Sequence, residues 1–315
     1  MRVSICASLL VLAGAAAVGA HGPDVHAAAD PRVFSPWDKA TLGGLILMAV
    51  LYAIGSRQLA SRGARRPRVE RPAFAVGWLA LVAAICPWFD AAALEHFSAH
   101  MAQHELMMLV GAPLMMAGRP LSTCLWALPE RWRGRFAVPL RRGALRTTMR
   151  RLTSPLLAWA LHGVVVWVWH APAFYELAVR SEAAHAVQHA TFVGTSILLW
   201  WGLLYGRYGR AGYGAAVFYV FTTAVHTGIL GALFTFAGAP LYSVYVGIPG
   251  VGIEGALADQ QVAGLVMWIP AGLLLTMMGV ALFAAWLGEA ERRGHRLEAA
   301  RHDAGTRPVV TMPGE

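Results

Sequence analysis

The chain has 315 residues, of which 57% are hydrophobic and 14% are charged, and its formal net charge is +9. A soluble domain carries roughly a quarter charged residues, so this composition excludes an ordinary soluble protein and favours several apolar membrane helices. The positive charge comes from 25 arginines and one lysine, and most of the arginines lie between apolar segments. That distribution is typical of membrane orientation and argues against a groove that binds nucleic acid.

The first 20 residues have the pattern of a secretory signal peptide. Arg2 supplies the positive start, the apolar run LLVLAGAAAV follows, and Val18-Gly19-Ala20 is a small-residue cleavage site. We expect cleavage there, with an uncleaved first helix as the alternative, because the apolar run is short and rich in alanine. Residues 21–37 then form a periplasmic N-terminal arm, which either captures copper(II) through His21 and His26 or is disordered.

Seven apolar runs follow, each near the roughly 20 residues that a helix needs to cross a bilayer. The runs are continuous rather than alternating, which favours helices over the strands of a membrane barrel. The expected fold class is therefore all-α, a polytopic bundle of about seven transmembrane helices at residues 38–288, followed by a cytoplasmic tail at 289–315. The expected spans are residues 38–56, 72–90, 98–118, 154–171, 185–205, 214–237 and 260–287.

Arginines are distributed between the loops in a way that orients these spans. The loop after the first span, the long loop 119–153, the loop after the fifth span and the tail are rich in arginine, whereas the alternate loops hold only Arg32, Lys39 and Arg180. The positive-inside rule then places the N-terminus in the periplasm and the C-terminus in the cytoplasm of a bacterial inner membrane. Loop 119–153 could also hold an amphipathic helix that lies against anionic membrane lipid.

Histidines gather at the predicted periplasmic end of the bundle. The run EHFSAHMAQHE places His100 and His104 at the start of the third span, and the run HAVQH places His185 and His189 at the start of the fifth. Residues four apart share one face of a helix, so the two histidines of each pair can converge on one ion. Polar groups are costly inside a bilayer and usually mark function there, so these pairs predict a metal or cofactor site.

Further histidines and one methionine are candidates for the same site. His170 closes the fourth span, His226 lies in the outer half of the sixth and Met267 lies in the seventh, so these three are reserve ligands. His96 lies about 12 Å from His104 along a helix axis at 1.5 Å per residue, which is too far for both to bind one ion. We expect His96 to support the ligands, to receive the ion first or to belong to a second site.

Carboxylate and amide side chains near this end are expected to surround the ligands. Glu105 lies one turn into the third span, where an unpaired charge is costly, so it is predicted to orient an imidazole. Gln188 precedes His189 and cannot supply a charge. Asp259 and Gln260 open the seventh span, where Asp259 is either the N-cap of that helix or part of the site.

The ligand types restrict the metal. Imidazole together with a thioether suits copper(I), whereas imidazole alone also suits copper(II), zinc or haem iron. Met101, Met107 and Met108 stand close to the histidines of the third span, although methionines in a membrane helix are usually packing residues. Copper is the expected cofactor, with haem as the alternative.

Four motifs, taken in order, resemble the CtaG family of membrane proteins linked to assembly of caa(3)-type cytochrome c oxidases. They are FSAHMAQHELMMLVGAPLMMAGRPL (97–121), WHAPAFYELA (169–178), HAVQH (185–189) and DQQVAGLVMWIPAG (259–272), and the resemblance covers about residues 38–288. It implies about seven helices and a role in maturing a haem–copper oxidase, with supply of copper as the expected contribution. The matching residues are His100, His104, His170, His185, His189, Asp259, Gln260 and Gln261, while Gln188 replaces an acid expected in many relatives.

The sequence therefore predicts a membrane-bound assembly factor, not an enzyme, that holds copper at an outward-facing histidine cluster and passes it to a haem–copper oxidase subunit. No hydrolytic triad, phosphate loop or dinucleotide fingerprint is present, and no nucleic-acid partner is expected. Three alternatives stay open: a copper permease, a haem-binding redox protein whose facing histidines ligate iron, and a scaffold whose histidines bind no metal.

Overall fold

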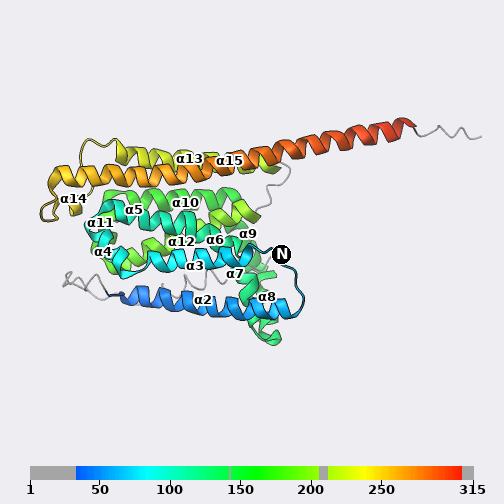
Figure 1. The fold of residues 1–315 in the computed structure, drawn as a ribbon, viewed down its shortest axis with the longest axis horizontal. Helices are drawn as coiled ribbons and strands as arrows, with labels where there is room; N and C mark the ends of the chain where they lie inside the picture. The colour runs from blue at the N-terminus through cyan, green and yellow to red at the C-terminus, as the bar shows by residue number, and fades with distance from the viewer. Residues whose placement is uncertain (1–32, 142, 206–211, 307–315) are drawn as a thin grey trace, which may run out of the picture.

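The computed structural model describes residues 33–141, 143–205 and 212–306, and all regular elements within these ranges are helical. The all-α fold class is therefore confirmed for this part of the chain. Figure 1 shows the long helices lying side by side along one direction. The predicted signal peptide, and most of the predicted N-terminal arm with His21 and His26, lie outside the described residues.

The N-terminal half of the bundle contains a broken helix and a continuous but irregular one. α2 (Pro36–Ser61) begins at a capping box in which Ser35 and Asp38 satisfy each other's backbone N–H groups. α3 (Glu70–Ala84) and α4 (Pro87–Glu95) meet at an angle of 53°, at the point where proline ends regular helix. α5 (Phe97–Glu105), the π-helical segment η1 (Leu106–Gly111) and α6 (Ala112–Ala117) then follow without a break.

The remaining helices complete the bundle, and several begin at proline, whose fixed φ suits the first helical position. They are α7 (Pro120–Ala127), α8 (Glu130–Arg141), α9 (Gly143–Leu152), α10 (Pro155–His170), α11 (Pro172–Arg180), α12 (Glu182–Tyr205), α13 (Gly212–Thr235), α14 (Ser243–Val246) and α15 (Gly252–Thr306). Figure 1 places α4, α11 and α14 at one end of the bundle and α7, α8 and α9 toward the other.

Within the described residues, three helices are long and apolar enough to cross a membrane: α2, α13 from Gly214 onward, and α15 as far as His295. Counting each bent pair as one span, α3 with α4 and Arg146–Leu152 with α10, raises the number to five. Helices occupy all seven predicted ranges, but the predicted count of seven spans is not confirmed. α12 is not among these candidate spans, because its histidines and Gln188 lower its mean hydropathy. α10 is too short to be a candidate by itself.

Two predicted spans differ from the helices that contain them, for physical reasons. The second predicted span, 72–90, is interrupted between α3 and α4, because Pro87 starts a new helix in a different direction. The helix that contains the seventh predicted span, α15, begins at Gly252 and adds about two turns before residue 260.

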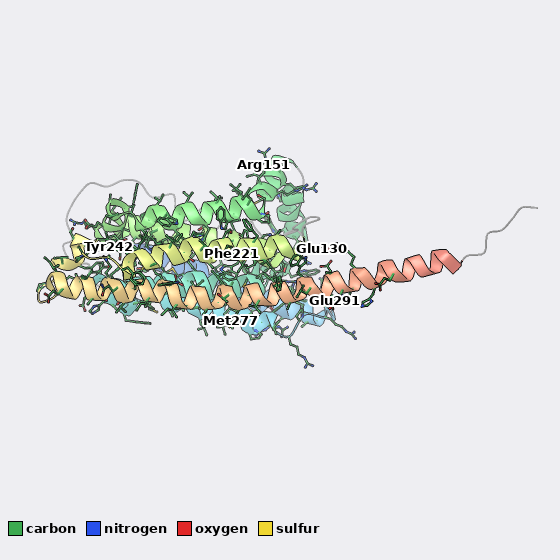
Figure 2. The ribbon with its side chains drawn as sticks, turned by 90° about the horizontal axis from the view of Figure 1, so that it is seen from above. Glu130, Arg151, Phe221, Tyr242, Met277 and Glu291 are labelled. Carbon is green, nitrogen blue, oxygen red and sulfur yellow. The ribbon has the colours of Figure 1, made fainter. Side chains whose placement is uncertain are left out.

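Large apolar side chains cover the outside of the bundle. Phe221 on α13 is 62% exposed and Met277 on α15 is 55% exposed, and Figure 2 labels both on these two neighbouring helices. Exposed apolar surface of this kind suits contact with lipid chains rather than with water.

Glycines allow α13 and α15 to approach closely, and the two helices lie along each other in Figures 1 and 2. A Cβ atom on Gly264 of α15 would lie 2.5 Å from the carbonyl oxygen of Gly231 and 2.6 Å from the amide nitrogen of Thr235, both on α13. Small residues at such contacts are the usual means by which helices pack in membranes, where dispersion replaces the hydrophobic effect.

We expect Gly264→Ala to destabilise the protein by about 1–3 kcal/mol, because the new methyl group meets backbone atoms that cannot rotate away. The measurement is the thermal unfolding midpoint of the purified protein in detergent. Gly43→Ala on exposed α2 is the control, since nothing lies within 4 Å of its added Cβ atom. Equal midpoints for the two variants would contradict a tight α13–α15 contact.

Candidate metal centre

Four histidines from two helices meet inside the bundle. His100 and His104 on α5 and His185 and His189 on α12 each offer a ring nitrogen, and these four nitrogens all lie within 4.8 Å of one another. Ring centroids are 4.5 Å apart within the α5 pair and 4.0 Å apart within the α12 pair. Between the helices, His100 lies 5.3 Å from His185 and His104 lies 5.2 Å from His189. We call these four residues the four-histidine cluster.

The cluster contains ring nitrogens without hydrogen-bond partners. Within the described residues, Nε2 of His100, His185 and His189 and both ring nitrogens of His104 are buried and unpartnered. Buried polar atoms are nearly always hydrogen-bonded, because an unsatisfied one keeps its desolvation cost without compensation. A neutral imidazole retains one nitrogen lone pair, so the cluster can present four lone pairs to one cation.

The spacing of the nitrogens is compatible with one ion after a small adjustment. Four nitrogens around a tetrahedral metal at about 2.0 Å lie roughly 3.3 Å from one another. The observed separations reach 4.8 Å, so rotation of the rings about their side-chain bonds has to bring the nitrogens closer. Within each pair the two histidines stand one helical turn apart, and the two pairs lie on facing helices, so all four rings border the same space.

Contacts with three other helices hold α5 in place. Asp259 of α15 accepts hydrogen bonds from the hydroxyl of Ser98 and, at 3.2 Å, from its backbone N–H. Gln103 is fully buried and donates to the carbonyl oxygen of Ala84 on α3 and to the carboxylate of Asp90 on α4, both at 2.6 Å. These contacts fix the height of α5, and therefore the height of its two histidines.

Asp259 is a helix cap, but of a different helix from the one predicted. It lies inside α15, which begins at Gly252, and it satisfies an N–H group in the first turn of α5. A carboxylate at this position also favours the positive end of the helix dipole. The contact between Gln103 and Asp90 was not predicted from the sequence, where its only signal is a glutamine between two histidines in HMAQH.

Gln260 and Gln188 were both expected to surround the ligands, but they lie in different places. Gln260 accepts from the backbone N–H of Leu241 at 2.7 Å and donates to the carbonyl of Ala239 at 3.4 Å, so it holds the segment between α13 and α14. Gln188 is fully buried on α12 and faces His100, but neither of its amide atoms closes a hydrogen bond. Gln188 therefore lies against the cluster, whereas Gln260 acts on the backbone nearby.

Glu105 does not orient an imidazole, which corrects the prediction. Its carboxylate instead lines a cavity of about 40 Å³, and its Oε2 has no hydrogen-bond partner among the described residues. The other polar or sulfur-containing residues that line this cavity are Met108, His162, Ser196, Thr223, Thr227 and Met267. A space of this size holds a few water molecules when several polar groups face it. Met267, predicted as a reserve ligand, therefore lies at this cavity and not in the four-histidine cluster.

The remaining predicted histidines lie outside the cluster. His96 is exposed and joins α4 to α5. His226 on α13 faces Trp159 and His162, with ring centroids 5.9 Å and 6.4 Å away. His170 lies closer: its ring packs on Phe192 at 6.0 Å, and Phe192 also packs on His104 at 4.6 Å.

Three tyrosines that the sequence analysis did not single out close the end of the bundle beside the cluster. The ring of Tyr175 lies 5.2 Å from that of His100, and its hydroxyl lies 2.7 Å from the hydroxyl of Tyr245. Tyr245 donates to the carbonyl of Ala93, and Tyr242 donates to the carbonyl of His170 at 2.8 Å. The hydroxyls of Tyr175 and Tyr245 therefore connect α11 to α14 and α14 to α4. The hydroxyl of Tyr242 connects the residue before α14 to α10.

Glu176 fastens α11 to the start of α14, outside the candidate spans. Its Oε1 accepts from the hydroxyl and the N–H of Ser243 at 2.6 and 2.8 Å, and its Oε2 accepts from Arg180 at 3.1 Å. The hydrogen bonds from Ser243, followed by the charge of Arg180, lower the pKa of Glu176 below its usual value.

Comparisons with known proteins identify the family of this chain. The family described as "Cytochrome c oxidase caa3 assembly factor (Caa3_CtaG)" matches residues 50–289, which is most of the chain. The chain belongs to this family, so the resemblance seen in its motifs is confirmed. Its apolar helices and its family together indicate a membrane protein.

Relatives of the chain are found among mycobacterial proteins. The uncharacterized protein Mb0105 of Mycobacterium bovis is 25% identical over 275 residues, covering 84% of this chain and 41% of that protein. The uncharacterized protein ML1998 of Mycobacterium leprae is 25% identical over 283 residues, covering 86% and 42%. The chain thus spans about two-fifths of the length of these curated relatives. No solved structure matches it.

We expect Asp259→Ala to reduce stability by about 0.5–2 kcal/mol, because it leaves the first turn of α5 without its cap. Asp259→Asn keeps an acceptor oxygen and is expected to retain most of that stability. The measurement is hydrogen exchange at the Ser98 amide together with the thermal unfolding midpoint. An Ala variant that protects Ser98 as well as the wild type does would contradict the cap.

The link between Glu176 and Ser243 is expected to depend on pH. Because the pKa of Glu176 is lowered, the link is fully present above the ordinary glutamate pKa of about 4.3 and is lost as pH falls through the lowered value. Hydrogen exchange at the Ser243 amide, corrected for intrinsic rates, measures this loss. Glu176→Gln should show weakened protection already at pH 7, and protection that does not change with acid would argue against the link.

Proposed function

We propose that this membrane protein binds copper at the four-histidine cluster and delivers it to a subunit of the cytochrome c oxidase that its family helps to assemble. The observation that carries the proposal is the set of four ring nitrogens within 4.8 Å, several of them buried and unpartnered. Imidazole ligands suit copper, and a haem–copper oxidase has to receive copper before it works. The assembly role of the family suggests that the oxidase would receive the bound ion.

The composition of the cluster suits delivery rather than permanent storage. It offers neutral imidazoles without a thiolate, so a bound copper ion is held less tightly than in a site built from cysteine. Two of the histidines, His185 and His189, are only partly buried, whereas His100 and His104 are 2% and 1% exposed. An incoming or departing ion would therefore meet the α12 pair first.

The proposed orientation places the cluster at the periplasmic face. Arginine-rich segments support it, because α8 and α9 lie toward the end of the bundle opposite α11 and α14 (Figure 1). At the arginine-rich end, Glu70 pairs with Arg66 at 3.2 Å and with Arg119 at 3.3 Å. The positive-inside rule assigns that end to the cytoplasm, which leaves the cluster, α11 and α14 outside.

The packing around the histidines favours copper over haem. Phe192 lies 4.6 Å from His104 and Tyr175 lies 5.2 Å from His100, so aromatic rings occupy space that a macrocycle would need beside its ligands. A single ion needs no such space. A red preparation with a Soret band would instead support the haem alternative.

The cavity at Glu105 supports a second candidate function, a copper permease. It places a carboxylate, hydroxyl groups and the thioether of Met267 next to the helix that carries His104. These groups could receive an ion that continues past the cluster. Copper uptake into proteoliposomes, lost in Glu105→Gln, would favour this candidate, and uptake equal to that of empty vesicles would leave delivery as the function.

The first experiment is metal analysis with absorption and electron paramagnetic resonance spectra after copper(II) loading of the purified full chain. We expect about one copper(II) per chain with nitrogen coupling, and its loss in the His104→Ala, His189→Ala double variant, which removes one ligand from each helix. His295→Ala is the matched control, because His295 is exposed on the far part of α15.

Two outcomes would contradict the proposal. Copper that stays in the double variant would place the site elsewhere. Absence of copper from both proteins would leave a scaffold whose histidines bind no metal. Maturation of the oxidase in cells carrying the double variant supplies the functional readout, since delivery predicts a copper-deficient oxidase.

A further inference from the structure

A methionine and a histidine face each other beside the four-histidine cluster, with one aromatic ring between the pair and the cluster. Nε2 of His170, at the end of α10, lies 3.4 Å from Sδ of Met101 on α5. Met101 is 1% exposed and His170 is 5% exposed, so both groups are shielded from solvent. Phe192 separates the pair from the cluster, because its ring packs on both His104 and His170.

The hydrogen bonding of His170 determines which ring nitrogen carries its proton. Nδ1 lies 2.7 Å from the carbonyl oxygen of Val166, which can only accept, so a neutral ring keeps its hydrogen on Nδ1. Nε2 then presents a lone pair to the thioether of Met101, which also carries lone pairs and has no hydrogen to donate. Two acceptors facing each other in a buried place gain nothing from their contact unless a cation lies between them.

The distance fits a metal bound by both atoms. Bonds of about 2.0 Å to nitrogen and about 2.3 Å to sulfur span 3.4 Å at a metal-centred angle of roughly 105°, close to the tetrahedral value. The backbone on both sides is fixed independently, since Tyr242 donates to the carbonyl of His170 and α5 is held through Ser98 and Gln103. The two ligand atoms are therefore already at bonding separation.

We propose that Met101 and His170 form a second metal site, selective for copper(I), beside the four-histidine cluster; the assignment of copper as its cargo rests on the proposed function. A thioether is a soft ligand that favours copper(I) over zinc or other hard divalent ions. The low-dielectric surroundings favour it too, because the cost of burying an ion rises with the square of its charge and is about four-fold larger for a divalent ion.

The second site would give the protein a place for the reduced form of its cargo. Met101 lies between His100 and His104 in sequence, so α5 contributes ligands to both sites from neighbouring faces. The four-histidine cluster accepts either oxidation state, whereas the Met101–His170 site holds only copper(I). The protein would accordingly bind two copper(I) ions per chain but only one copper(II).

The test is anaerobic titration of the purified full chain with copper(I) in the presence of a competing chelator, followed by X-ray absorption spectroscopy. The wild type is expected to bind two equivalents, with a sulfur scatterer near 2.3 Å. Met101→Leu is expected to bind one equivalent without sulfur, and to keep its copper(II) site. Met107→Leu is the control, because Met107 is equally buried on the same continuous helix but packs in a different part of the core.

A second set of measurements separates the two sites, first without mutation and then with the double variant. When zinc first fills the four-histidine cluster, one equivalent of copper(I) should still bind and should show the sulfur signal. The His104→Ala, His189→Ala variant should likewise keep one copper(I) with sulfur, so loss of the cluster and loss of the second site give different results.

Three results would overturn the inference. Wild-type protein that binds one copper(I) through nitrogen alone would remove the second site while leaving the proposed function intact. A sulfur signal that persists in Met101→Leu would assign the thioether to another methionine. Absence of copper(I) from every protein, with absence of copper(II) from the cluster, would remove the second site and the proposed function together.

Discussion

A neutral imidazole carries one N–H group and one lone pair, and inside a bundle that faces lipid neither of them can be given to water. Each such ring must therefore find a partner in the protein or in a bound ion. His170 uses Nδ1 for the carbonyl of Val166 and leaves Nε2 against sulfur. In the four-histidine cluster the rings meet this requirement differently, because four ring nitrogens gather within 4.8 Å of one another and several of them have no hydrogen-bond partner. The helices around it are arranged so that this convergence holds.

The arrangement of the four histidines depends mainly on the position of α5. Ser98, at its first turn, is tied to Asp259, and Gln103, between the two histidines, is tied to Ala84 and Asp90. Phe97 packs edge-on against Tyr175, Phe234 and Tyr242 at centroid distances of 5.2, 5.3 and 4.9 Å. Polar and aromatic contacts together therefore hold this part of α5 in place. The π-helical segment η1 begins directly after this fixed part, as such segments often do near functional sites.

The sequence predicted the helical fold and the residues of the cluster for clear physical reasons. Continuous apolar runs can only form helices in a bilayer, and i, i+4 spacing places two histidines on one face. It could not predict that the α5 and α12 pairs face each other, because spacing leaves the rotation of each helix about its axis undetermined. It also could not predict where Glu105 and Asp259 point, since both act across helix contacts between residues far apart in the chain.

The break between α3 and α4 shows a similar limit on predicting spans. Hydropathy treats residues 72–90 as one run, whereas Pro87 redirects the backbone by 53° and brings Asp90 back toward Gln103. The polar residues that build the site lower the mean hydropathy of the helices that carry them. These residues face the protein interior and not lipid. Counting spans by composition is therefore least informative for the helices that build the site.

The length of α15 links the two ends of the molecule mechanically. The helix runs for 55 residues, and at 1.5 Å per residue it is about 80 Å long, well beyond the roughly 30 Å of a bilayer core. Near its start Asp259 holds α5, and its far part, around Glu291, extends past the rest of the bundle in Figure 2. A protein that binds the projecting segment would therefore contact the same continuous helix that supports the first turn of α5, so the tail and the four-histidine cluster are connected through one helix.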